Sequence, residues 1–111
     1  MGETRTFSDP GLTVTQVCFD HAVTLLVAND SVSYRIRIEG AMHVGRHRID
    51  PGRWPIDAAP IVALIHEPVV CIEADDLQLS VCTRQDILTV ARADEFIAWM
   101  LAGPDGLKLW G

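Results

Sequence analysis

His43 and His47 are the only close pair of histidines in the sequence, and Asp50 follows them. A catalytic metal site needs about three protein ligands and an open position, and His66 could supply a third imidazole. The spacing of the pair is diagnostic only on a helix, and Gly45 between them disfavours a helix. We therefore interpret them as solvated loop histidines, with a small metal-dependent enzyme using His43, His47 and His66 as an alternative.

A basic and aromatic loop overlaps this pair. Its candidate residues for binding an anion or a partner are Arg46, His47, Arg48, Arg53 and Trp54. Guanidinium groups pair with oxyanions, and tryptophan stacks on bases, so the loop could hold a phosphate, a carboxylate or single-stranded nucleic acid. The alternative is internal neutralisation, because Asp50 and Asp57 lie close in the sequence and Arg stems often cover Trp faces.

The remaining groups point to chemistry less strongly. Glu73, Asp75 and Asp76 cluster at a predicted hairpin tip, with Asp94 and Glu95 downstream. They could bind a basic partner or a hard cation, but acidic residues at such tips mostly form turns. The sequence contains neither Gly-x-Ser-x-Gly nor a glycine-rich phosphate loop, so we expect no catalytic residues and no cofactor. A non-enzymatic role is favoured over an enzyme.

Composition limits the partners and the location. The 111 residues carry a net charge of −6, which disfavours nucleic acid and anionic lipid and favours basic partners. No apolar run approaches the roughly 18–20 residues that span a bilayer, and no signal sequence opens the chain, so we expect a cytoplasmic protein. Cys18, Cys71 and Cys82 are an odd set without C-x-x-C spacing, which predicts buried free thiols.

The elements that would position these residues are mostly strands. Residues 1–10 are polar and predict a flexible leader, before a single β-rich domain over residues 11–111. Residues 58–66 favour a short helix over a buried strand, because Pro60 fits its first turn and Pro68 ends it. Alternating or β-branched residues predict strands at 12–19, 22–28, 32–39, 42–44, 69–74, 77–82, 87–91, 95–101 and 107–110. Segment 95–101 could instead be a short helix.

The two halves of the domain echo each other at a shift of about 54 positions. This weak internal duplication covers about 12–39 and 69–91, each a run of three strands with the same apolar phase. We expect a mainly β (α+β) fold, with two related antiparallel β-meanders packed as a small sandwich or open barrel and one connecting helix near 58–66. A two-residue turn at Asp75 and Asp76 would place Cys71 opposite Ser80 and diagonal to Cys82.

Several segments resemble a known group of small bacterial proteins, domain of unknown function 6188. The segments are Val14 to Val17 with Asp20-x-Ala22-Val23-Thr24-Leu25, the hairpin from Val70 to Val81, and Glu95 to Leu101 with Gly103-Pro104-x-Gly106 and Trp110. The resemblance covers most of the chain after Gly11. It implies no activity that could be assigned to residues of this sequence.

By elimination, these observations favour a non-enzymatic binding or protein-interaction module. Unpaired outer strands at the ends of each meander could pair with a protein partner or with a second copy in a homodimer. Trp110 is the candidate interface residue, whereas Trp99 is expected in the core. We expect no membrane partner, and the charge disfavours nucleic acid. Anion or nucleic-acid binding through the Arg46–Trp54 loop stays an alternative.

Overall fold

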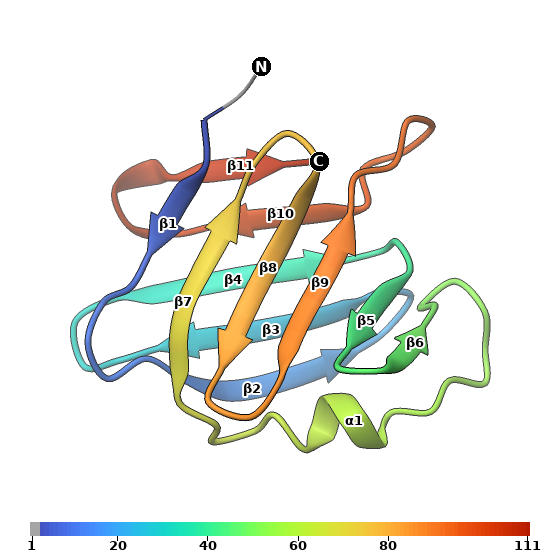
Figure 1. The fold of residues 1–111 in the computed structure, drawn as a ribbon, viewed down its shortest axis with the longest axis horizontal. Helices are drawn as coiled ribbons and strands as arrows, with labels where there is room; N and C mark the ends of the chain where they lie inside the picture. Colours follow the sequence, from blue (N-terminus) through green and yellow to red (C-terminus); the bar gives the residue numbers. More distant parts are fainter. Residues whose placement is uncertain (1–2) are drawn as a thin grey trace.

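Alternating apolar and polar residues build two antiparallel sheets in the computed structural model, which describes residues 3–111 (Figure 1). One sheet has the strand order β1-β7-β8-β9-β5-β6 and the other β11-β10-β4-β3-β2. The strands are β1 (Arg5–Phe7), β2 (Thr13–Phe19), β3 (Val23–Ala28), β4 (Ser33–Ile38), β5 (Met42–Val44), β6 (His47–Ile49), β7 (Val69–Ala74), β8 (Gln78–Thr83), β9 (Ile87–Ala91), β10 (Trp99–Ala102) and β11 (Lys108–Trp110). The predicted mainly β sandwich is confirmed, and neither sheet closes into a barrel within these residues.

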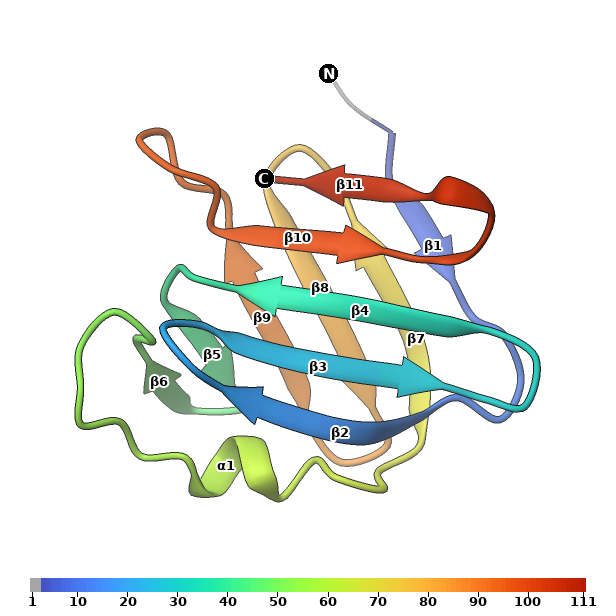
Figure 2. The ribbon, with the colours of Figure 1, turned by 180° about the vertical axis from the view of Figure 1, so that it is seen from behind.

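Each half of the chain contributes to both sheets. β2–β3–β4 and β7–β8–β9 form the two expected meanders, one in each sheet. The β5–β6 hairpin of the first half pairs with β9, and the β10–β11 hairpin of the second half pairs with β4 (Figure 2). The prediction of unpaired strands at the ends of the meanders is therefore wrong for β4 and β9, which the exchanged hairpins cover. It is also wrong for β7, which pairs with β1, so that of the meander strands only β2 lies at a sheet edge among the described residues.

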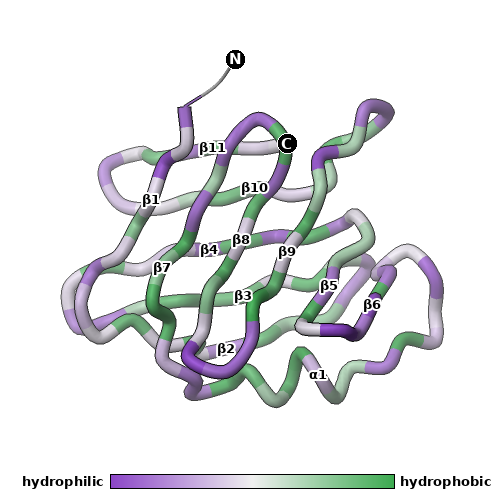
Figure 3. The backbone as a smooth tube through the Cα atoms, viewed as in Figure 1, coloured by the Kyte–Doolittle hydropathy of each residue, from purple (hydrophilic) through white to green (hydrophobic). Residues whose placement is uncertain are grey.

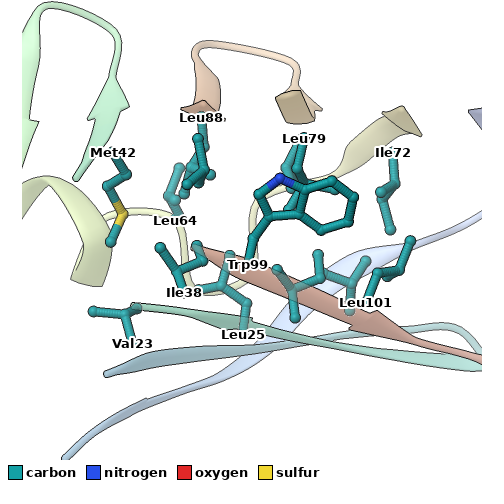
Figure 4. Packing of buried hydrophobic residues seen from close by; sticks show 14 of the residues in the cluster. Val23, Leu25, Ile38, Met42, Leu64, Ile72, Leu79, Leu88, Trp99 and Leu101 are labelled. Carbon is teal, nitrogen blue, oxygen red and sulfur yellow. The ribbon is translucent and has the colours of Figure 1, made fainter. Parts of the chain in front are cut away.

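The core lies between the sheets and follows the predicted alternation. On β3, Val23, Leu25 and Val27 are buried, while the residues between them are partly exposed. Trp99 lies between the two layers, near Leu79 of the opposite sheet (Figure 4). Burying one valine or leucine side chain stabilises the fold by about 1.5–3 kcal/mol, so the shared core holds the two sheets together.

The fold begins earlier than the sequence predicted. Residues 5–7, placed in the predicted leader, form β1 and pair with β7 from Arg5↔Ala74 to Phe7↔Ile72. This pairing is a long-range contact, which a search for local apolar runs does not detect. Residues 1–2 of that leader lie outside the described residues.

Three other elements differ from their predicted bounds. The helix α1 covers only Ala59–Val62, and the Asp57 carboxylate accepts the Ala59 N–H at 3.1 Å. β6 lies in a segment that the sequence assigned to a surface loop, and β10 begins at Trp99 instead of residue 95. No helix within residues 3–111 is both long and apolar enough to cross a membrane.

Candidate functional site

A cleft opens at one end of the sandwich, between the β7–β8 turn and the loop that joins β9 to β10. Figure 1 shows these two segments at the same end of the molecule. It has two parts, of about 400 and 120 Å³, that share Asp75, Asp76 and Trp110. The larger part is also lined by Arg92, Ala93, Asp94, Glu95, Phe96, Ile97 and Gly111. The smaller part is also lined by Glu3, Arg5, Ala74, Trp99 and Leu109.

The β7–β8 turn forms one wall, and Asp75 fixes its shape. The Asp75 carboxylate Oδ1 accepts the N–H groups of Leu77 at 2.7 Å and Gln78 at 2.9 Å. Because the Asp75 N–H also donates to the Gln78 carbonyl, the turn is centred on Asp76 and Leu77, one residue later than predicted. Asp75 thus has the turn-forming role expected of it, and Asp76 and Leu77 lie exposed at the tip.

Backbone hydrogen bonds fasten the β9–β10 loop, which forms the other wall. The Arg92 N–H donates to the Leu77 carbonyl at 2.8 Å, and the Ala98 N–H donates to the Gly111 carbonyl at 2.7 Å. The Gly40 N–H donates to the Ala98 carbonyl at 3.0 Å, and a Cβ at Gly40 would lie only 2.7 Å from the Ala98 Cβ. Only glycine permits this approach, so Gly40 helps to set the position of the loop.

Large apolar side chains gather around the cleft. Phe96 is 53% exposed, Ile97 43% and Trp110 59%, and all three line its larger part. The hydropathy colouring shows that hydrophilic residues of the β7–β8 turn and the β9–β10 loop lie at the same end of the molecule (Figure 3). The cleft is therefore apolar and aromatic on part of its surface, with a polar rim.

Trp99 lines the smaller part and carries an unpaired buried donor. Its side chain is 2% exposed, and its Nε1 has no hydrogen-bond partner among the described residues. Gly111 covers the nitrogen-bearing edge of the ring, where an added Cβ would lie 2.7 Å from Nε1. An unpaired buried N–H costs about 1–3 kcal/mol, and Gly111 closes this one off from an outside acceptor.

The cleft carries excess negative charge. Its carboxylates belong to Glu3, Asp75, Asp76, Asp94 and Glu95, and its guanidinium groups to Arg5 and Arg92. Elsewhere the described residues form ion pairs from Arg37 to Asp20 and Glu39 and from Arg53 to Asp50. Within residues 3–111, none of the cleft carboxylates makes an ion pair, so their field extends into the cleft.

The Arg46–Trp54 loop lies on the β5–β6 hairpin and the segment after it. Its five candidate residues, Arg46, His47, Arg48, Arg53 and Trp54, are all exposed. The Arg53 side chain is 86% exposed and its Nε lies 3.9 Å from the Asp50 carboxylate. This contact partly offsets the positive charge, in line with internal neutralisation, although such an exposed pair is weak.

The three histidines of the predicted metal set do not converge. His43 is paired with Arg48 across the β5–β6 hairpin and His47 with Val44, so His43 and His47 face opposite sides of it. His66 follows α1, where its N–H donates to the Val14 carbonyl. In the described part of the chain, no group of three or more His, Cys, Asp or Glu side chains could hold a metal ion.

The cysteine positions also require a correction. Cys71 lies directly opposite Cys82, not opposite Ser80, because the β7–β8 turn is displaced and the pairing shifts with it. All three thiols are free, but Cys18 is exposed and the other two are only partly buried. Burial raises the pKa of the Cys71 thiol to about 11, and the neighbouring Cys82 and Glu73 add to the increase.

Sequence reasoning missed the apolar part of the cleft. Phe96 and Ile97 fit a predicted strand, which would bury one of the two, whereas both lie exposed in a loop. The signal that could have indicated this is Asp94-Glu95 directly before them, since acidic residues are depleted from strands.

The sequence profile of a family of unknown function, DUF6188, matches residues 10–110. No curated protein and no solved structure matches the chain.

Proposed function

The chain belongs to DUF6188, a family of unknown function, so its role has to be inferred from the cleft. We propose that the protein is a cytoplasmic, non-enzymatic binding or protein-interaction module. The observation that carries the proposal is the grouping of Phe96, Ile97 and Trp110 around one cavity, each more than two-fifths exposed. Exposed aromatic and apolar side chains that gather at a concave site with a polar rim are typical of interaction sites. The occupant that we propose is a segment of a protein partner.

The sheet edges offer less support for pairing with a partner. β1, β6 and β11 are outer strands of only three residues each. The outer side of β2 is partly engaged, because the Val14 N–H donates to the Glu67 carbonyl and the His66 N–H donates to the Val14 carbonyl. Short or covered edges are poor templates for strand addition, so the cleft is the better candidate.

The proposal is tested by capturing partners with the full chain and with matched variants. Trp110→Ala and Phe96→Ala truncate the cleft, and Trp54→Ala is the control, because Trp54 is 55% exposed in a distant loop. Truncating an aromatic anchor typically costs about 2 kcal/mol of binding, so we expect at least a roughly tenfold loss of the captured partner for each cleft variant.

Equal capture by wild type and both cleft variants would contradict the proposal. Loss of capture by Trp54→Ala alone would move the interface to the Arg46–Trp54 loop. Sedimentation of the same proteins detects self-association. If the wild type is a homodimer and Trp110→Ala is still a homodimer, the dimer interface lies outside the cleft.

A further inference from the structure

The charge of the cleft restricts its occupant. Asp76, Asp94 and Glu95 are exposed at the larger part, and Arg92 is the one guanidinium that lines it. A positive group entering there gains attraction from carboxylates that make no ion pair within the described residues. An anionic ligand would be repelled by the same groups.

The apolar and aromatic side chains of the cleft restrict the occupant further. Phe96, Ile97 and Trp110 line the larger part, and each is more than two-fifths exposed. A metal ion or a simple ammonium ion offers these side chains no apolar surface. A phosphate offers none either, and it carries the wrong charge. A Lys or Arg residue of a peptide offers both a cationic head and an apolar stem.

The layout of the cleft suits these two groups. The larger part, of about 400 Å³, has room for a long side chain, and Trp110 and Phe96 offer faces on which a cation binds. The smaller part, of about 120 Å³, adjoins it at Asp75, Asp76 and Trp110 and contains Trp99. An extended peptide segment can therefore occupy both parts at once.

From these observations we propose that the cleft binds a basic peptide segment of the partner protein. A Lys or Arg side chain lies among Asp76, Asp94 and Glu95, with its apolar stem against Trp110 and Phe96. This inference rests on the proposed function, because it names the chemistry of the partner that occupies the same cleft.

The three tryptophans provide a direct test, because each gives one indole N–H resonance. The labelled full chain is titrated with acetyl-Ala-Arg-Lys-Ala-amide, and in parallel with acetyl-Ala-Glu-Glu-Ala-amide and acetyl-Ala-Leu-Leu-Ala-amide. We expect the basic peptide to shift the Trp99 and Trp110 resonances and to leave Trp54 unchanged.

A pair of double variants tests the charge. Asp76→Asn/Glu95→Gln neutralises two cleft carboxylates, and Asp30→Asn/Glu67→Gln removes the same charges away from the cleft. Asp75 is left intact because its carboxylate holds the turn. We expect affinity for the basic peptide to fall about tenfold in the cleft variant and less than twofold in the control.

The outcomes separate the two proposals. If the leucine peptide shifts Trp99 and Trp110 as strongly as the basic peptide does, the cleft binds peptides but the basic specificity is wrong. If none of the three peptides shifts either resonance, the binding cleft and its specificity both fail. A Trp54 shift with the acidic peptide alone would support the anion-binding loop and overturn this inference.

Discussion

The phenol of Tyr34 donates a 2.6 Å hydrogen bond to the carboxylate of Asp9, which ties the segment after β1 to β4. The Tyr34 ring also lies against Phe7 of β1, with the ring centroids 5.4 Å apart. Two strands from opposite sheets are thus linked through one side chain. The N-terminal segment is held by this contact as well as by the pairing of β1.

Tyr34→Phe should destabilise the fold. The substitution leaves the ring in place but deprives the partly buried Asp9 of its donor, and we expect a loss of about 1–1.5 kcal/mol in the free energy of unfolding. Urea denaturation near neutral pH measures this loss. The control is Ser33→Ala at the exposed neighbouring position, which should change stability by less than about 0.5 kcal/mol. Equal stability of wild type and Tyr34→Phe would show that the hydrogen bond contributes nothing.

Tyr34 should also make the fold sensitive to alkali. Burial, and then its hydrogen bond to Asp9, raises the pKa of Tyr34 from 10.0 to about 12. Because the folded state holds this proton more tightly, the contribution to stability is complete below pH 10.0 and is lost as the pH rises to about 12. Tyr34 is the single tyrosine, so the absorbance of the phenolate follows its titration directly. A midpoint at the unfolded value would contradict this prediction.

Gly40→Ala should disturb the wall of the cleft. The new Cβ would lie 2.7 Å from the Ala98 Cβ, and overpacking of this kind costs about 1–3 kcal/mol. We expect a lower melting temperature and faster amide exchange at Ala98, where three backbone hydrogen bonds fasten the loop. Gly52→Ala is the control, since its Cβ would meet only the Asp50 carboxylate at 3.3 Å.

The cysteines should differ in reactivity. Cys18 is exposed, whereas Cys71 is partly buried and its pKa is raised to about 11. Since the thiolate is the reactive form, iodoacetamide at mildly alkaline pH should modify Cys71 at least about tenfold more slowly than Cys18. Peptide mass spectrometry over time measures both rates. In denaturant the two cysteines should react at similar rates. If they also react at similar rates in the folded protein, the fold does not protect Cys71.

Cutting the chain between its halves should give fragments that fold only together. A break at residues 55–56 lies in the loop after β6, and each half then supplies one meander and the hairpin that completes the other sheet. A meander alone has an uncovered apolar face, so each fragment should be disordered on its own. Circular dichroism of the mixture should recover the strand signal. A folded single fragment would contradict this expectation.

Local pattern was enough to predict much of the fold. Tyr34, Ile36 and Ile38 alternate with polar residues, and the structure buries all three. Pro60 indicated the first turn of α1 correctly, although the helix is shorter than predicted. Such features depend on neighbours in the sequence, which is why they can be read without a structure.

Features that depend on distant contacts were not predictable. The segment 5–7 carries one apolar residue and becomes a strand only because β7 lies beside it. The cleft joins the β7–β8 turn, the β9–β10 loop and the end of β11, so no single motif marks it. The Arg46–Trp54 loop was conspicuous in the sequence because its residues are consecutive or nearly so.

The exchanged hairpins have a consequence for synthesis of the chain. β4 emerges from the ribosome early, but its partner β10 is nearly the last strand to be made. The meander β2–β3–β4 must therefore keep the outer side of β4 without a hydrogen-bonding partner until translation is almost complete. The nascent protein is exposed to mispairing for that interval, and a chaperone bound to β4 would cover the open edge until β10 is made.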